Sequence, residues 1–405
     1  MASAEGVSQP ARAISPAAAG PDERLVRTWA EIDLDALRHN VRAVRAAVGA
    51  GTRMLATVKA DAYGHGYERV SRTLVEEGVD FLGVANVVEA LQVRDTLNHL
   101  RHDVRIMTLG ANLVGEMDAV IANGFVPLVC SWEEAVAYEA GAAEAGVRLE
   151  VHVKVDTGMG RIGLWKDGCV DEIERIARLP HLSIEGVATH FPSADEEDQS
   201  FSREQIAEFE RIVGALEARG VRVPLRHAAN SSAIAHLPAG RFNMVRPGLV
   251  LYGLYPSAHL AAEHRLGVRP VLGLTTRVVF IKEIGAGRTI SYGRTFTATE
   301  RMRVATLAIG YGDGYSRELS NRGEVLVCGR RARILGTVTM DQTMVDVTHI
   351  PEARVGDEAV LIGRQGDEAI GVAELAAHMG TIPYIVTCSI SKRVVRRYVE
   401  GATAV

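Results

Sequence analysis

The chain has 405 residues, which is too long for one ordinary hydrophobic core and predicts at least two domains. Hydrophobic residues make up 47% and charged residues 23%, a composition typical of globular proteins that bury a core. The formal net charge of −5 provides no basic surface, so neither nucleic acid nor an anionic membrane is expected as a partner.

Residues 1–23 are rich in Ala, Ser, Gly and Pro and lack the apolar core of a secretory signal, so we expect a disordered tail. No stretch approaches the roughly 18 uninterrupted apolar residues that a membrane span needs. The four cysteines, Cys130, Cys169, Cys328 and Cys388, are widely spaced and form no CxxC pair. This spacing predicts no zinc or redox motif and is typical of a chain in the reducing cytoplasm.

Eight short apolar runs alternate with longer amphipathic segments between about residues 53 and 248. The runs lie at 53–60, 81–86, 105–110, 126–130, 149–157, 184–190, 225–230 and 243–248. The segments at 131–146 and 199–220 have the three-to-four-residue apolar spacing of helices. Eight such units predict an α/β fold, a (β/α)8 barrel of TIM type. An open doubly wound sheet is the alternative, but no GxGxxG follows the first run.

A second domain is predicted from about residue 266, where the runs become β-branched and are separated by glycine. We expect a barrel domain over 24–265, a linker near 256–270, and a mainly β C-terminal domain over 266–405. The sequence leaves open whether a first strand near 24–34 joins the β domain. It predicts that the following helix starts near Asp35, an acceptable N-cap.

Barrel enzymes build their sites at the C-terminal ends of the strands, so polar residues there are candidates. Lys59 closes the first apolar run, in VKADAYGHG. Desolvation of a lysine at that place lowers its pKa and favours Schiff-base chemistry with an aldehyde. The alternative is a lysine whose amine reaches solvent from the strand end. Tyr63 follows four residues later, and its alternative is an ordinary loop aromatic.

Two further strand ends carry basic side chains. Arg161 follows the fifth run in DTGMGRIG, where glycines permit a tight turn and a guanidinium could clamp a carboxylate or phenolate. Lys154 faces the same region if the strand alternation points it inward. His190 ends the sixth run. The alternatives are a solvated arginine in an ordinary turn and a structural histidine.

The last two strand ends predict a phosphate site. Asn230 and Ser231 cap the next helix, and helix N-termini bind phosphate, although a plain N-cap is the alternative. Arg246 and Gly248 lie in the eighth run, and barrels often bind phosphate after strands seven and eight. A lysine, two arginines, a histidine and a phosphate cradle at one rim suit a phosphorylated aldehyde. They suit a metal much less, because HExxH and carboxylates at metal spacing are absent from the sequence.

These motifs together resemble the bacterial alanine racemases, barrel enzymes that use pyridoxal 5′-phosphate. The resemblance spans about residues 28–398 and is carried by VKADAYGHG, DTGMGRIG, HAANSSA, NMVRPGLVLYG, SYGRTF, IGYGDGY and MDQ. It implies interconversion of L- and D-alanine and, in bacteria, a supply of D-alanine for peptidoglycan. It also implies a head-to-tail homodimer, in which Tyr292 and Met340 reach the cofactor held by the other subunit.

The resemblance implies roles around the cofactor. Lys59 would bind it and, with Tyr292 on the opposite face, act as one of two catalytic bases. Arg246 would hydrogen-bond the pyridine nitrogen, and His190 would lie behind the ring, linked to Tyr292 and Arg246. The cofactor contacts would be Lys59, Tyr63, Arg161, His190, Asn230, Ser231, Arg246, Gly248, Leu249 and Tyr384.

The resemblance also implies roles around the substrate. Arg161 would steady the substrate carboxylate, Met340 and Asp341 would line the pocket, and Tyr311 would stand at its entrance. Lys154 matches a lysine that is carbamylated in some members.

General chemistry agrees with these roles. Racemisation removes a proton from one face and returns one to the other, which two bases achieve without large motion. An arginine does not give its proton to the pyridine nitrogen, so the ring stays a weaker electron sink and side reactions such as transamination are limited. A tyrosine base near neutral pH needs positive neighbours, because its reference pKa is about 10.

Two residues depart from the family pattern. Asp61 stands where many members have Asn, a small polar exchange. Thr337 stands where some members have Arg near the access channel, which leaves substrate preference open between alanine, serine and a broader range.

Three other functions compete with a racemase. A related barrel-plus-β decarboxylase would use an acidic residue at the ring nitrogen, where this chain offers Arg246. A non-catalytic single-barrel protein that binds the same cofactor would lack the β domain with Tyr292. A metal-dependent barrel hydrolase is the third.

Overall fold

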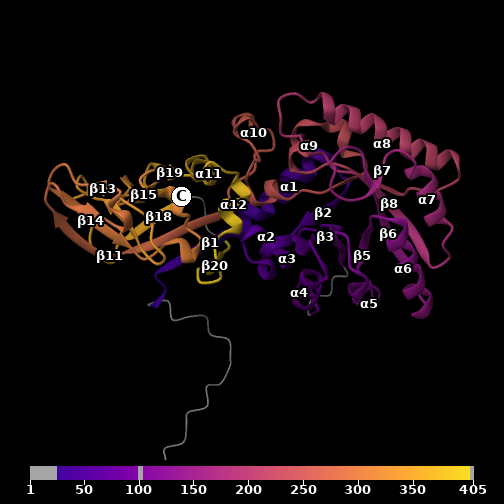
Figure 1. Cartoon of the computed structure of the whole chain (residues 1–405), viewed down its shortest axis with the longest axis horizontal. Helices are drawn as coiled ribbons and strands as arrows, with labels where there is room; N and C mark the ends of the chain where they lie inside the picture. Colours follow the sequence, from indigo (N-terminus) through magenta and orange to yellow (C-terminus); the bar gives the residue numbers. More distant parts are fainter. Residues whose placement is uncertain (1–24, 99–103, 402–405) are drawn as a thin grey trace, which may run out of the picture.

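The computed structural model describes residues 25–98 and 104–401, so the tail expected at 1–23 lies outside the described residues. Two bodies follow one another along the long axis, a barrel surrounded by helices and a domain built mainly of strands (Figure 1).

The barrel is closed, as predicted, because β5 pairs with β6 as well as with β4. Its eight parallel strands are β2 (Arg53–Thr57), β3 (Phe81–Val84), β4 (Arg105–Thr108), β5 (Val126–Val129), β6 (Leu149–Asp156), β8 (Leu182–Ala188), β9 (Leu225–His227) and β10 (Met244–Val245). These strands coincide with the eight apolar runs of the sequence. A short strand, β7 (Leu164–Trp165), adds to β6.

Helices cover the outside of the barrel. They are α1 (Leu34–Val48), α3 (Tyr67–Glu76), α4 (Val87–Leu97), α5 (Met117–Ala122), α6 (Trp132–Glu144), α7 (Cys169–Ala177), α8 (Ser200–Ala218) and α9 (Ser231–His236). The prediction of a cap at Asp35 is wrong. Asp33 has the extended backbone of an N-cap and accepts a hydrogen bond from the Ala36 N–H at 2.8 Å, so Asp35 lies inside the first turn.

The C-terminal domain is mainly β, as predicted. Its strands are β11 (Leu272–Ile284), β12 (Thr289–Ile290), β13 (Phe296–Thr297), β14 (Met302–Leu307), β15 (Glu324–Val327), β16 (Arg330–Arg333), β17 (Thr343–Asp346), β18 (Glu358–Gln365), β19 (Glu368–Ile370) and β20 (Val395–Val399). Two helices, α11 (Val372–Met379) and α12 (Pro383–Cys388), pack near the barrel. The segment at 256–270, expected as a linker, contains the helix α10 (Ala258–Glu263).

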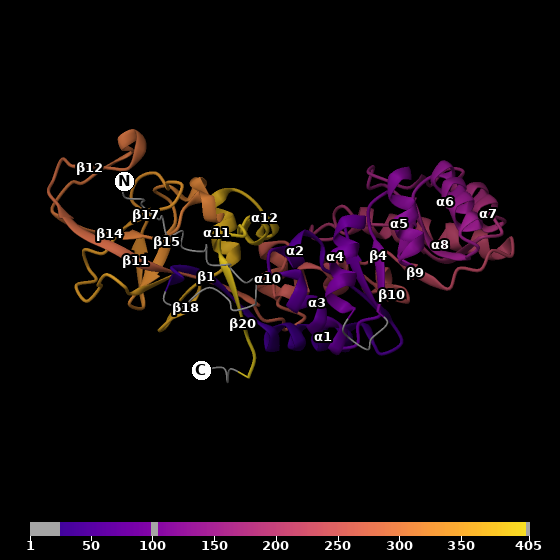
Figure 2. The same cartoon turned by 90° about the horizontal axis from the view of Figure 1, so that it is seen from below.

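The first strand, β1 (Thr28–Asp33), belongs to the sheet of the C-terminal domain. It pairs antiparallel with β11 and parallel with β20, and Figure 2 shows β1 and β20 where the two bodies meet. The chain therefore begins its described part in one domain, builds the barrel, and returns to the first sheet.

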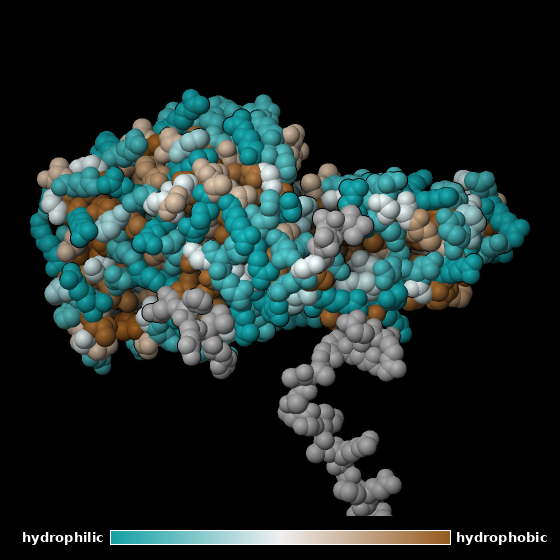
Figure 3. All heavy atoms as spheres, turned by 180° about the vertical axis from the view of Figure 1, so that it is seen from behind, coloured by the Kyte–Doolittle hydropathy of each residue, from teal (hydrophilic) through white to brown (hydrophobic). Residues whose placement is uncertain are grey.

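Hydrophilic residues cover much of the face shown in Figure 3, with apolar residues interspersed among them. Among the described residues, no helix combines the length and the apolar character required to cross a membrane.

The two domains meet closely at the loop that follows β2. A Cβ on Gly64 would lie 2.0 Å from the carbonyl oxygen of Thr387 in α12, and a Cβ on Gly66 would lie 1.9 Å from the Tyr398 hydroxyl in β20. Arg396 donates two hydrogen bonds to the Gly64 carbonyl, at 3.1 and 3.3 Å. Only glycine allows this approach, so the β domain directly fixes a barrel loop.

We expect Gly64→Ala to lower stability by about 3 kcal/mol or more, because it adds a backbone clash to the strain of a positive φ. The matched control is Gly146→Ala, where φ is also positive, +64°, but no atom lies within 4 Å of the added Cβ. That control should cost about 1 kcal/mol. Urea unfolding midpoints measure both, and equal losses would contradict the close packing at Gly64.

Candidate active site

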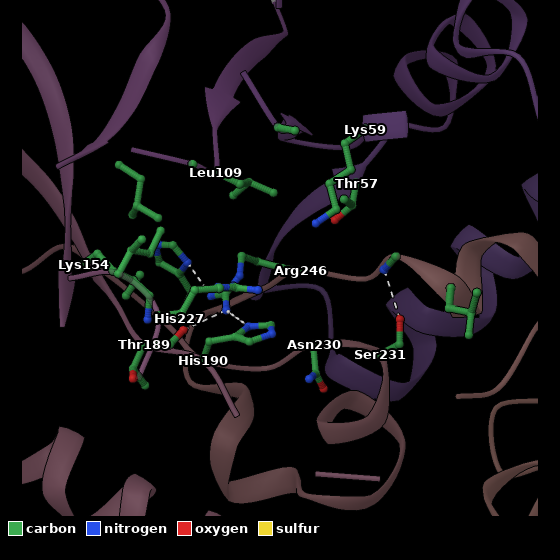
Figure 4. Close-up of a pocket in the computed structure, with 18 of the residues that line it drawn as sticks. Thr57, Lys59, Leu109, Lys154, Thr189, His190, His227, Asn230, Ser231 and Arg246 are labelled. Carbon is green, nitrogen blue, oxygen red and sulfur yellow. Dashed lines mark hydrogen bonds between the residues drawn. The ribbon is translucent and has the colours of Figure 1, made fainter. Parts of the chain in front are cut away.

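A cavity of about 430 Å³ opens at the C-terminal ends of the barrel strands. Its volume lies within the range of about 300–1,000 Å³ that small-molecule sites occupy. Side chains from several strand ends converge on it (Figure 4). Those singled out from the sequence that line it are Lys59, Tyr63, Lys154, Arg161, His190, Asn230, Ser231, Arg246, Gly248, Leu249 and Tyr384.

Lys59 opens a left-handed turn. It begins the short helix α2 (Lys59–Tyr63), in which the four residues 60–63 all have φ near +54°. Such backbone is costly for residues other than glycine and persists only where the surroundings hold it. Glu89 holds the entry by accepting from the N–H of Ala60 at 2.9 Å, and Asp61 accepts from the N–H of Tyr67 at 2.9 Å. Asp and Asn both tolerate this conformation and both offer that acceptor, so the departure at Asp61 is compatible with the turn.

The amine of Lys59 points into the cavity (Figure 4). Burial lowers its pKa, and the positive charge of Arg161 lowers it further. A lysine with a lowered pKa has a larger neutral fraction near pH 7. Only the neutral amine can attack an aldehyde or take up a proton, so the position favours both reactions.

Arg246 lies in the middle of the site and makes its hydrogen bonds without a carboxylate. Its guanidinium donates to His227 Nδ1 at 2.7 Å, to His190 Nδ1 at 3.1 Å, and to the carbonyl oxygens of Thr189 and Ala228 at 2.8 and 3.0 Å. Burial, followed by the charge of Arg161, lowers its pKa to about 10. Among the described residues, no hydrogen bond uses its Nε–H, which leaves a donor for a ligand.

His190 contacts Arg246, as the resemblance implies, but it has no contact with Tyr292 within the described part of this chain. Burial lowers the pKa of His190 well below its usual value, and the charge of Arg246 adds to the effect. His190 is therefore neutral near pH 7, and it accepts at Nδ1 from the guanidinium.

A small polar cradle forms the other end of the cavity. The Ser231 hydroxyl accepts from the N–H groups of Gly248 and Val250, at 3.0 and 3.3 Å. A Cβ on Gly248 would lie 2.7 Å from the Tyr63 hydroxyl, so glycine keeps this space open. The Tyr384 ring lies 5.9 Å from that of Tyr63.

The cradle, the lysine and the Arg246 donor fit the three ends of a phosphorylated pyridine aldehyde. The hydroxyls of Ser231, Tyr63 and Tyr384 suit a phosphate, the amine suits the aldehyde, and Nε–H suits a ring nitrogen. Asn230 caps α9 through its side chain, which accepts from the Ala233 N–H at 3.0 Å.

Tyr292, Met340, Asp341 and Tyr311 are not brought to this cavity by the single chain. They lie on the β domain, with exposed fractions of 74% for Tyr292, 53% for Met340 and 43% for Tyr311. Tyr292 begins the turn η5 (Tyr292–Arg294) between β12 and β13, at the end of the β domain farthest from the barrel (Figures 1 and 2).

Thr337 supports the turn that carries Tyr292. It is buried, and its hydroxyl donates to the Tyr292 carbonyl at 2.9 Å. Thr337 is therefore packed beneath the turn that carries Tyr292. The resemblance implied a residue near the access channel and did not predict this packing.

Sequence reasoning missed several polar groups that shape the site. Glu89 holds both the Lys59 turn and the Ala85 N–H, at 2.7 Å. His152 and His227 are fully buried inside the barrel. The signal for the two histidines was a polar residue inside an apolar strand run, in LEVHVKVDT and LRHAAN, but only the strand ends were considered.

Comparison with known proteins identifies relatives over nearly the whole chain. The family model described as "Alanine racemase, N-terminal domain" matches residues 32–256, and the model described as "Alanine racemase, C-terminal domain" matches residues 271–398. An alanine racemase of Halothermothrix orenii is 43% identical over 93% of this chain and 98% of its own length. One of Symbiobacterium thermophilum is 44% identical with the same coverage of both chains.

Solved structures give the same result. Alanine racemase of Clostridium difficile superimposes with a TM-score of 0.86 at 36% identity, covering 93% of this chain and 96% of that one. The structure of Bacillus anthracis alanine racemase with bound L-Ala-P has a TM-score of 0.86 at 35% identity, with 93% and 96% coverage.

We expect Lys154 to react with carbon dioxide. Burial, and then the charge of Arg246, lowers its pKa to about 7, so the amine becomes neutral as the pH rises through that value. The neutral amine adds to carbon dioxide and releases a proton, and the resulting carbamate would lie near two arginines. The 13C resonance from labelled bicarbonate should therefore grow with pH and vanish in Lys154→Met. The same resonance in that variant would contradict the assignment.

Proposed function

The chain belongs to the alanine racemase family, and we propose that it interconverts L- and D-alanine with pyridoxal 5′-phosphate bound at Lys59. The observation that carries the proposal is the meeting of Lys59, the Arg246 donor and the Ser231–Gly248 cradle in one cavity. The identity to relatives over nearly the full chain supports the substrate.

The cofactor, when bound, supplies an aldehyde that holds the amino group and a ring that draws electrons from Cα. Residues of the chain would transfer the proton and hold the substrate. Lys59 Nζ, whose pKa is lowered by burial, would take or return the Cα proton on one face. The Tyr292 hydroxyl oxygen does the same on the opposite face. Arg161 holds the substrate carboxylate.

Arg246 sets the reaction type. Its Nε–H would donate to the ring nitrogen of the bound cofactor without transferring the proton, which would limit electron withdrawal and favour return of the proton to Cα. A decarboxylase of the same fold would need an acid at this position. The β domain with Tyr292 supports a racemase over a non-catalytic binding protein.

A head-to-tail homodimer completes the site in this proposal. Tyr292 is exposed at the far end of the β domain, Met340, Asp341 and Tyr311 are exposed elsewhere on it, and a second copy would bring all four to the cavity. Met340 and Asp341 would then line the substrate pocket and Tyr311 its entrance.

The product would be D-alanine for peptidoglycan. Alanine is favoured over serine by the relatives. We also propose a cytoplasmic location, because Cys130, Cys169, Cys328 and Cys388 are all free thiols.

Lys59→Ala should abolish the visible absorbance of protein-bound cofactor, because the amine that binds the aldehyde is gone. Lys166→Ala, which changes a lysine outside the cavity, is the control and should keep the absorbance. Absorbance like that of the wild type in Lys59→Ala would overturn the assignment of the anchor.

Tyr292→Phe removes only the phenolic oxygen and should slow deuterium exchange from solvent into one alanine enantiomer by about 10²-fold or more. Exchange into the other enantiomer, through Lys59, should fall much less. NMR of each enantiomer in deuterated buffer measures both rates. Equal, undiminished exchange would remove Tyr292 as a base.

Mixed Lys59→Ala and Tyr292→Phe subunits should regain racemase activity. A hybrid dimer with shared sites has one site with both wild-type bases, whereas sites formed within one chain would each lack a base. Subunit exchange is verified by mass spectrometry of the hybrid. Proven hybrids without recovered activity would contradict the shared site.

A further inference from the structure

A line of buried polar side chains runs from Arg246 through the barrel to its opposite end. Arg246 donates to His227 Nδ1 at 2.7 Å, His227 Nε2 lies 2.7 Å from His152 Nδ1, and His152 Nε2 lies 3.0 Å from Glu185 Oε2. Both histidines are fully buried. Glu185 also pairs with Arg105, and both line a second cavity at the N-terminal ends of the strands.

The ends of this line fix the direction of every hydrogen bond. A guanidinium has no acceptor, so His227 Nδ1 must accept and the proton of His227 must lie on Nε2. His227 then donates to His152 Nδ1, and His152 donates from Nε2 to Glu185. A second proton on either ring would place two N–H groups against each other. Burial, the first cause in each case, also lowers the pKa of both histidines.

The same line of side chains links the positive charge of Arg246 to a negative charge. Within residues 25–98 and 104–401, no carboxylate forms a hydrogen bond or ion pair with Arg246. The carboxylate of Asp156, which is near the site, is occupied by the N–H groups of Gly158, Gly160 and Arg161. Burial would raise the pKa of Glu185, but His152 and Arg105 outweigh it and hold that pKa below its usual value, so Glu185 is ionised.

We propose that Glu185 is a positioning residue that acts through His152 and His227 as the remote counter-charge of Arg246, keeping its guanidinium protonated and aimed at the cofactor ring. This inference rests on the proposed function. Glu185 and His152 do not line the cavity, and His227 lines it beside Arg246, to which it is hydrogen-bonded.

Loss of this negative charge makes Arg246 a stronger acid, so the ring nitrogen gains a larger share of its proton and withdraws more electrons. Some turnovers then end in half-transamination. Alanine loses its Cα proton and amino group and leaves as pyruvate, with its ketone oxygen from water. The amino group and two electrons stay on the cofactor, which takes up a proton at its former aldehyde carbon.

The test compares Glu185→Gln with Glu150→Gln in the full-length enzyme. Glu150 also pairs with Arg105, at 2.6 Å, but among the described residues it forms no hydrogen bond with either histidine, so it controls for a general charge effect. Glu185→Gln should raise pyruvate released per racemisation about tenfold, equivalent to one pKa unit on Arg246. Glu150→Gln should match wild type, and Glu185→Asp, which keeps the charge, should lie near it. Equal values in Glu185→Gln and Glu150→Gln would overturn the proposal.

A second measurement needs no variant and no turnover. Imidazole 15N shifts of histidine-labelled wild-type protein should show His152 and His227 neutral, each with its proton on Nε2. A proton on Nδ1 of either ring, or a doubly protonated ring, would overturn the relay even if Glu185→Gln failed to fold. Failure of the wild type to racemise alanine would instead overturn the proposed function and leave these shifts unchanged.

Discussion

A guanidinium enclosed in the mouth of the barrel without a carboxylate in contact is the constraint on which this site depends. In the part of the chain that the structure describes, no residue hydrogen-bonded to Arg246 is negatively charged, so the groups around it must be neutral or distant. His190 and His227 meet the requirement by accepting from it while uncharged. The pKa values of Lys154 and Lys59 are lowered, in part by the charge of Arg246, which raises the neutral fraction of both amines. The same positive charges that help to lower the pKa of Lys59 also favour an anionic ligand in the cavity.

The barrel interior is divided to suit this arrangement. One side is filled by an apolar cluster, whose buried members are Leu55, Phe81, Met107, Val126 and Met244. The other side, from β6, β8 and β9, carries His152, Glu185 and His227. Phe81 meets His152 edge to face at 6.1 Å, where the two sides join. The apolar side lowers the local dielectric constant, so electrostatic interactions on the polar side are screened less than in water. A hydrogen-bonded line there therefore transmits the effect of a charge more strongly.

The sequence predicted much of the fold and one half of the site. The barrel strands were visible because each is a continuous apolar run, buried on both faces. Lys59, Arg161 and Arg246 were visible because strand ends of a barrel share one rim. The left-handed turn at 60–63 was not visible, since nothing in KADAY signals four consecutive positive φ angles. The pairing of β1 with β20 was not visible either, because it joins residues more than 360 apart in the chain. Inward-facing His152 and His227 were passed over because a lone histidine in a strand carries no sign of its partners.

The β domain contacts the loop that follows Lys59 and also carries Tyr292, so in the proposed dimer each chain would contribute to two sites. Its own Lys59 stands on a strained turn whose end, Gly64, is held by Thr387 and Arg396. Its Tyr292 stands on the opposite end of the same domain, where Thr337 supports the turn from below. Because both ends belong to one domain, a second copy that contacts Tyr292 in the proposed dimer would also contact the domain that holds the Lys59 turn. In the proposed dimer, the relative placement of the two bases is therefore set by the sheets of both β domains as well as by the barrel that holds the ligand.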